Sequence, residues 1–182
     1  MLPLRLHGEC ARRGYRLADQ QDIQATDEEK ARVKEMQEAV GKPGNPSSSE
    51  VTSTDIRLFA RAVGYTDPIY FDEAEAKKQG HRALPAPPGY TGRPIFNPNA
   101  EGGGGGGGRD PLFPNGLNGG TEVEPVAQIY AGDVLTSVSS ATSIELMPSR
   151  AYKRMIVRKT ETVYTNQDGE VVAKTRGTGI SY

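Results

Sequence analysis

The chain of 182 residues contains one cysteine and two histidines. A single cysteine, Cys10, excludes an internal disulfide and fits a reducing compartment. His7 and His81 have no companion ligands at metal-site spacing, and no nucleophile motif accompanies them. The sequence therefore gives no support for a metal centre or a Ser-His-Asp hydrolase, and we expect no metal or bound cofactor.

Long apolar runs are also missing, so no segment is predicted to span a bilayer. The first residues, MLPLRLHGECARRGYRL, have no continuous apolar core and no small-residue cleavage pattern, which argues against a secretory signal. An arginine-rich opening also fits an organelle transit peptide, but a poorly structured N-terminus over residues 1–24 is the simpler interpretation. The net charge of −1 gives no reason to expect nucleic acid or a membrane as partner. We expect a cytoplasmic protein.

The most informative stretch runs from Val51 to Pro88. Thr52 and Asp55 have capping-box spacing and predict a helix over Ser53–Val63. Gly64 follows, where a left-handed residue would end the helix. Four apolar side chains at helical spacing would face the core: Ile56, Phe59, Ala60 and Val63.

A polar turn follows this helix and reads Tyr65-Thr66-Asp67-Pro68-Ile69-Tyr70-Phe71-Asp72. Asp72 would cap a short helix over Glu73–Gln79, which Gly80 would end. Ala86-Pro87-Pro88 then forces an extended entry into the next element.

This order of parts resembles the start of a MaoC-like dehydratase, a hotdog-fold hydratase that acts on acyl-CoA or acyl-carrier thioesters. In that family the turn reads D-x-N-P-x-H-x-D, and its first Asp and its His are the catalytic pair. Asp67-Pro68 matches the Asn-Pro, Asp72 matches the final Asp, and Ala86-Pro87-Pro88 matches the start of the buried central helix. The catalytic positions fall on Tyr65 and Tyr70, so both catalytic groups are missing. The chain is most similar to the N-terminal, FAS1-like dehydratase domain of this superfamily, which usually lacks the pair and works beside a competent partner.

The resemblance covers about residues 51–182 and implies an α+β hotdog fold, in which an antiparallel sheet wraps a central helix. That helix would begin after Pro88, although Pro94 and Pro98 would break it early. The glycine run Gly102–Gly108 predicts an insertion over about residues 97–116, which is either a mobile lid or a slack surface loop.

An extra helix is predicted before this region. Thr26 and Glu29 form a capping box that would open a helix running to about Val40. Val33, Met36, Gln37 and Val40 would face the body of the protein, and Lys42–Ser49 would be a linker. We therefore expect a single hotdog domain over residues 25–182, with this helix as part of it.

The C-terminal half predicts the sheet. Asn118 and Gly119 would lead into its first strand. Short turns at Ala131-Gly132-Asp133, Pro148-Ser149-Arg150 and Asn166–Gly169 would separate antiparallel strands. The open edge of such a sheet can pair with another subunit. The four expected strands are Glu122–Ile129, Val134–Met147, Tyr152–Thr165 and Glu170–Ser181.

Hydration of an enoyl thioester needs a base, an acid and a donor to the thioester oxygen. Pro88-Gly89-Tyr90, at the expected helix start, would supply the donor. No acid or base is found: His81 is expected to be a solvated loop residue, and Asp67 should bond its own backbone. We predict no catalytic residue in this chain, and substrate-binding roles for Tyr65, Asp67, Tyr70, Pro88, Gly89, Tyr90, Asn118 and Gly119.

A basic run lies on the third predicted strand and in the turn before it. Its members would either meet the phosphates of CoA or form a solvated face: Arg150, Lys153, Arg154, Arg158 and Lys159.

By resemblance, the chain is a hotdog subunit of an enoyl-CoA hydratase or (3R)-hydroxyacyl-thioester dehydratase. It would shape the acyl tunnel as a homodimer, or as a heterodimer with a subunit that supplies the catalytic Asp and His. One alternative is a self-sufficient hydratase, or a hotdog thioesterase, that uses another carboxylate. The other alternative is a non-enzymatic acyl-CoA-binding or scaffold subunit.

Overall fold

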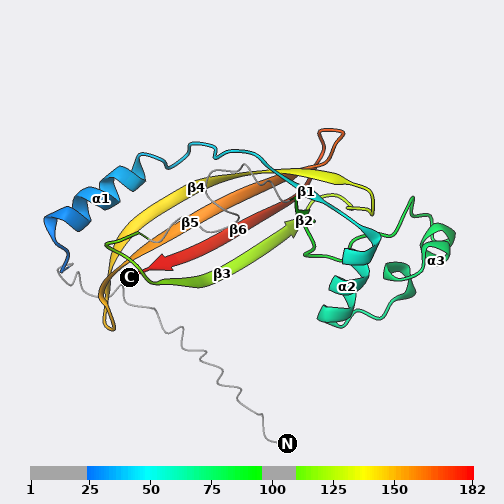
Figure 1. Cartoon of the computed structure of the whole chain (residues 1–182), viewed down its shortest axis with the longest axis horizontal. Helices are drawn as coiled ribbons and strands as arrows, with labels where there is room; N and C mark the ends of the chain where they lie inside the picture. Colours follow the sequence, from blue (N-terminus) through cyan, green and yellow to red (C-terminus); the bar gives the residue numbers. More distant parts are fainter. Residues whose placement is uncertain (1–23, 96–109) are drawn as a thin grey trace, which may run out of the picture.

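A six-stranded antiparallel sheet in the order β2-β1-β4-β5-β6-β3 forms the larger layer of the molecule (Figure 1). The computed structural model describes residues 24–95 and 110–182, so the glycine run and nearly all of the predicted loose N-terminus lie outside the described residues. Within those two ranges, no helix has the length and apolarity needed to cross a membrane. The strands are β1 (Ser47–Glu50), β2 (Arg93–Pro94), β3 (Gly116–Pro125), β4 (Val134–Ser149), β5 (Lys153–Thr165) and β6 (Val171–Ser181).

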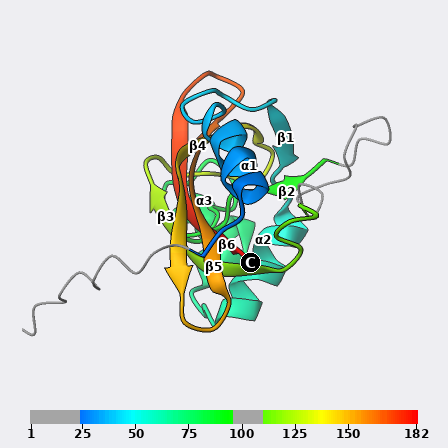
Figure 2. The same ribbon diagram turned by 90° about the vertical axis from the view of Figure 1, so that its left-hand side faces the viewer.

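The helices lie on one side of this curved sheet, α1 towards one end and α2 with α3 towards the other (Figures 1 and 2). Two hydrophobic clusters join the layers. One packs Ile56 of α2 and Leu84 against Leu135 and Val172 of the sheet. The other packs Val33 of α1 and Phe113 against β4 and β5. The helical elements are α1 (Asp27–Gln37), α2 (Ser53–Val63), the 3-10 turn η1 (Pro68–Tyr70) and α3 (Glu73–Lys78).

Helix α2 has the predicted bounds because its end signals are local. Thr52 Oγ1 accepts a hydrogen bond from the backbone N–H of Asp55 at 3.1 Å. Gly64 closes the helix in the left-handed conformation, with a φ of 83°. Ile56 and Ala60 are fully buried, as predicted, whereas Val63 in the last turn is 52% exposed. The apolar stripe therefore reaches the core only through the first part of the helix.

Helix α1 is confirmed as an added helix that packs on the sheet. Val33 is buried, Met36 and Val40 pack beside it, and Gln37 Nε2 donates to Ile144 O at 2.8 Å. The helix ends at Gln37 rather than Val40, because Val40 leaves it to form a bridge with Ala141 of β4.

Glu29 anchors α1 to the sheet. Its carboxylate accepts from the backbone N–H of Thr26 at 2.8 Å and from Arg154 of β5, whose Nε lies 2.7 Å away. The hydrogen bond from Arg154 is the main reason that the pKa of Glu29 is lowered, although burial acts in the opposite direction. A capping residue thus also forms the ion pair between two layers.

Replacing Glu29 with Gln is expected to reduce the free energy of unfolding by about 2–3 kcal/mol, because Arg154 loses a charge-assisted partner inside the protein. Glu28→Gln, on the exposed side of the same helix, should change it by less than about 0.5 kcal/mol. A lowered folded-state pKa means that the Glu29 contribution is present above the unfolded pKa, about 4.3, and is lost as the pH falls through the folded value. Urea unfolding at neutral and acidic pH measures both effects; equal losses in the two variants would contradict the anchoring role.

The first of the four predicted strands, β3, begins earlier than predicted, at Gly116 instead of Glu122. The glycine- and asparagine-rich lead-in pairs with β6, and Gly119 is accommodated as a bulge between Asn118 and Gly120. The strand ends at Pro125 instead of Ile129, where Val126 N and Ala127 N both donate to Val172 O. The predicted linker, Lys42–Ser49, contains most of β1, since Ser47–Glu50 pair with Ser137–Val134 of β4. The other strand bounds differ from the predicted ones by at most two residues.

The central helix expected directly after Pro88 is not formed in residues 88–95. Gly89 and Gly92 adopt left-handed φ values of 92° and 86°, which turn the chain instead of continuing a helix. Arg93 and Pro94 then form β2 against Glu50 and Ser49. The remainder of the expected helix lies in the part of the chain that the structure does not describe.

Gly92→Ala is expected to cost about 2–4 kcal/mol of stability, since a left-handed Ala is strained and its Cβ would lie 3.0 Å from Ser49 Cβ and 3.2 Å from Glu50 O. Gly80→Ala is the matched control, because Gly80 has a φ of 91° and nothing within 4 Å of the added atom. The control should lose only about 1–2 kcal/mol. If chemical denaturation gave equal losses of unfolding free energy for the two variants, residue 92 would not be packed tightly against β1.

Candidate functional site

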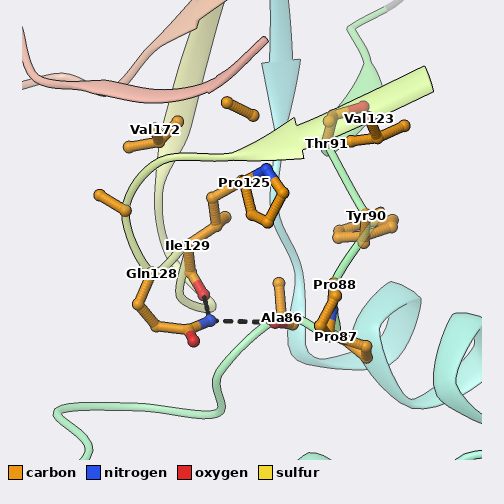
Figure 3. Close-up of a pocket in the computed structure, with 13 residues that line it drawn as sticks. Ala86, Pro87, Pro88, Tyr90, Thr91, Val123, Pro125, Gln128, Ile129 and Val172 are labelled. Atoms are coloured by element: carbon orange, nitrogen blue, oxygen red, sulfur yellow. Dashed lines mark hydrogen bonds between the residues drawn. The ribbon is translucent and has the colours of Figure 1, made fainter. Parts of the chain in front are cut away.

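Two short antiparallel segments, residues 84–86 and 129–131, form the base of the candidate site. Ala86 N donates to Ile129 O at 2.7 Å, and Ala131 N donates to Leu84 O at 2.9 Å. The neighbouring prolines have no backbone N–H to add to this pairing. The side chain of Gln128 adds it instead: Nε2 donates to Ala86 O at 2.9 Å and to Ile129 O at 2.8 Å (Figure 3). The proline-rich entry is thereby fixed against the chain that leaves β3.

A small cavity of about 60 Å³ lies between this entry and the ends of β3 and β6 (Figure 3). Prolines, alanines and the aliphatic side chains of Val123, Ile129 and Val172 make up most of its wall, and none of the described residues that line it is charged. Ligand pockets commonly measure about 300–1,000 Å³. The cavity therefore suits a small apolar group and is too small for a long acyl chain.

Tyr90 is one of the residues that line this cavity. Its ring packs on Phe59 of α2 with centroids 5.3 Å apart. Its hydroxyl is buried and has no hydrogen-bond partner among the described residues. Burial, reinforced by the negative charge of Asp55, raises the pKa of Tyr90 to about 12. The hydroxyl is therefore a neutral donor at physiological pH.

Three of the predicted substrate-binding residues, Pro88, Gly89 and Tyr90, line this cavity. The predicted donor at a helix N-terminus is wrong in its detail, because no helix begins there and Tyr90 N donates to Pro87 O at 3.1 Å. The remaining predicted residues do not line the cavity.

Tyr65 and Tyr70, which the sequence resemblance aligns with the family's catalytic positions, pack on each other with ring centroids 5.4 Å apart. Tyr65 is 39% exposed, and Tyr70 is half-buried. Burial is the largest cause of a raised pKa at Tyr70, with Tyr65 and Asp67 adding to it. The Tyr70 hydroxyl is thus poorly suited to act as a base at neutral pH. A binding role for the pair stays a prediction.

Asp67, Asn118 and Gly119 take up structural positions. Asp67 Oδ1 accepts from Ile69 N at 3.1 Å and caps η1, as expected for Asp before Pro. Asn118 Oδ1 accepts from Gly120 N at 2.9 Å beside the bulge in β3. Asn118 lies five residues before Val123, or about 17 Å along an extended strand, so the structure does not bring it to the cavity. Substrate binding by these residues also stays a prediction.

Asp133, a buried carboxylate beside the base of the site, was not predicted from the sequence. It is 1% exposed and accepts from Tyr130 N at 2.8 Å, from Arg82 Nη2 at 2.5 Å and from Gln167 Nε2 at 3.1 Å. His81, predicted to be a solvated loop residue, is half-buried, with Nδ1 3.3 Å from Tyr130 Oη. The turn-like sequence Ala131-Gly132-Asp133 gave no hint that its Asp is buried, because the partners come from distant segments.

The residues of the predicted basic cluster that lie on β5 point to both faces of this strand. Side chains alternate along β5, so Arg154 and Arg158 share the face of buried Ile156, whereas Lys153 and Lys159 point to the opposite face. Arg154 is occupied by Glu29 and lies over the Phe113 ring, 5.0 Å from its centroid. These residues do not form one phosphate-binding surface. In the described ranges, no group of three or more His, Cys, Asp or Glu side chains is placed to hold a metal ion.

Solved structures with the same fold belong to several hydratases and dehydratases. The ChsH1-ChsH2 complex from Mycobacterium tuberculosis contains a chain that matches with a TM-score of 0.61 and 20% identity, over 84% of this chain and 95% of that one. A chain of the HadBC (3R-hydroxyacyl-ACP dehydratase) complex from the same organism matches with a TM-score of 0.56 and 20% identity, over 78% and 96%. The R-hydratase PhaJ1 from Pseudomonas aeruginosa matches with a TM-score of 0.52 and 18% identity, over 78% and 81%. These matches confirm the hotdog fold.

No curated protein sequence matches the chain. A family model does match it, and its description is "FAS1-like, dehydratase domain region". The match spans residues 38–175, which include β1, the turn with Tyr65 and Tyr70, the cavity and most of the sheet. Since this is well over half of the sequence, the chain belongs to the FAS1-like dehydratase domain family.

Proposed function

We propose that this chain is a non-catalytic hotdog subunit of an enoyl-CoA hydratase or (3R)-hydroxyacyl-thioester dehydratase. The observation that carries the proposal is the packing of Tyr65 on Tyr70, because the sequence resemblance aligns these two residues with the family's catalytic Asp and His. A base and an acid are needed to add water across an enoyl double bond. In this proposal they come from a partner subunit, and this chain shapes the acyl site in the cytoplasm. The substrate is carried by CoA or an acyl-carrier thioester, and no metal or cofactor takes part.

The open sheet edge supports assembly with a partner. Among the described residues, strand β3 pairs with β6 alone and leaves a ten-residue edge, which can be continued by a strand of another subunit. Two of the similar structures, ChsH1-ChsH2 and HadBC, are complexes of two different proteins. A heterodimer with a catalytic hotdog subunit fits both observations.

The placement of the carboxylates gives little support to a self-sufficient hydratase or thioesterase. Asp67 is used in capping η1. The Asp133 carboxylate already accepts three hydrogen bonds, and Asp133 is not one of the residues that line the cavity. Because both of these carboxylates already have structural roles, the partner-dependent reaction is the stronger proposal. A scaffold without turnover would show the same assembly but no activity.

Capture of the tagged chain from its own organism, followed by mass spectrometry and light scattering, tests the proposed assembly. The expected result is a stable heteromer with a hotdog protein that carries Asp and His where this chain has Tyr65 and Tyr70. The tag alone is the control for non-specific capture. Recovery of the chain only as a monomer, or only with proteins that lack those two residues, would contradict the proposal.

A further inference from the structure

A second cavity, of about 270 Å³, lies over the middle of β4, β5 and β6. It shares no lining residue with the cavity described above. Side chains alternate along β5, so its residues Lys159 and Glu161 point away from the face on which Ile156 packs against α1. Their cross-strand neighbours in β6, Thr178 and Arg176, share their face. The second cavity therefore lies on the side of the sheet opposite the helices.

The wall of this second cavity is polar. The register of β4 against β5 shifts between Ala141 and Ser143, which makes Thr142 the extra residue of a β-bulge, and a bulge bends its strand. Apart from Gly177, every described lining residue has a polar or charged side chain. A hydrocarbon ligand would gain little from such a wall, whereas a ligand rich in hydroxyl groups can form hydrogen bonds with it.

The charges in the wall favour a single negative charge on the ligand. Lys159, Arg176 and Glu161 together leave one positive charge. Arg176 is already engaged, since Nη2 donates to Glu124 at 2.9 Å and Nε donates to Glu161 at 3.2 Å. Lys159 is exposed and has no ion pair among the described residues. A carboxylate can pair with Lys159, whereas a dianionic phosphate would be repelled more strongly by the glutamates around Arg176.

We propose that the second cavity binds a polyhydroxylated carboxylate, the chemical class of the sugar acids, with its carboxylate paired to Lys159. The hydroxyl groups of the ligand bond to Glu161 and to the hydroxyls of Thr142 and Thr178. At about 10–15 Å³ for each water-sized group, about 270 Å³ holds about 18–27 such groups, so a six-carbon sugar acid fits. This binding role is independent of the proposed function.

An NMR titration of the full chain with gluconate, followed by amide chemical shifts, tests the proposal. The ionic strength is held constant because salt screens exposed charges. Saturable shifts are expected at Lys159, Gly177 and Thr178, with a Kd of about 1 mM for a ligand of this size. Sorbitol keeps the hydroxylated six-carbon chain without the charge, and hexanoate keeps the carboxylate without the hydroxyls. Both of them, and inorganic phosphate, should bind at least about fivefold more weakly.

Substitutions in the wall test which side chains hold the ligand. Lys159→Gln, at an exposed position, should weaken gluconate binding about five- to tenfold and leave the thermal midpoint unchanged. Thr178→Val keeps the branched shape, removes the hydroxyl and should weaken binding about threefold. Lys174→Gln is the matched control, because Lys174 lies two residues from Arg176 on the same face of β6 and outside the cavity. It should change the affinity by less than about twofold.

Any of four results would overturn the inference: no saturable shift at the second cavity, sorbitol or hexanoate binding as tightly as gluconate, phosphate binding more tightly than gluconate, or equal affinities of Lys159→Gln and Lys174→Gln. None of these measurements uses a thioester or a partner subunit. Failure of this inference is therefore distinguishable from failure of the proposed function.

Discussion

Purified alone, this chain is expected to hydrate crotonyl-CoA no faster than the uncatalysed background, whereas its complex with the catalytic partner should turn over at about 1–10³ per second. The reason is chemical. The resemblance to the family aligns Tyr65 and Tyr70 with its base and acid positions, and burial raises the pKa of Tyr70. A neutral phenol does not activate water efficiently at pH 7, so the loss of both groups removes the reaction and not just part of its rate.

Loss of absorbance at the enoyl double bond measures the reaction in three samples: chain, partner and complex. Tyr70→Phe in the complex is the matched control, since it keeps the ring against Tyr65 and removes only the hydroxyl. It should retain turnover within about twofold. Enzyme-like turnover by the chain alone would overturn the non-catalytic assignment, and an inactive complex would favour the scaffold alternative.

Elements with local end signals could be predicted from the sequence. Helix α2 begins and ends as expected because Thr52 and Gly64 act within one turn of the helix. The hairpin between β5 and β6 follows from Asn166–Gly169, whose Gly169 has a φ of 82°. Part of the site was predictable in the same way, because the prolines before Gly89 dictate an extended entry.

Features that depend on distant partners could not be predicted. Ser47–Glu50 has no β-branched residue or aromatic ring to suggest a strand, and it becomes one by pairing with β4. Phe113 was assigned to the insertion, yet it is 2% exposed because α1 and Arg154 cover it. The cavity wall needs β3, β6 and the Pro87–Tyr90 loop together, and no single segment encodes that arrangement.

Asp133→Ala is expected to lower the free energy of unfolding by about 3–5 kcal/mol, the largest stability effect predicted for a single side chain in this protein. The carboxylate joins three segments, since it bonds Tyr130 N, Arg82 and Gln167. The Asp133 backbone adds a fourth, as its carbonyl accepts from Val51 N at 3.0 Å. Arg82 is 54% exposed and can be solvated after the change, but Tyr130 N loses its acceptor inside the protein.

Urea unfolding followed by circular dichroism measures this loss, because the chain has no tryptophan to report it. Asp133→Asn keeps one acceptor oxygen for Tyr130 N and gives up the charge, so it should lose about half as much. Asp168→Ala, in the exposed hairpin next to Gln167, is the matched control and should change stability by less than about 0.5 kcal/mol. A loss below about 1 kcal/mol in Asp133→Ala would contradict the role of the carboxylate as a junction.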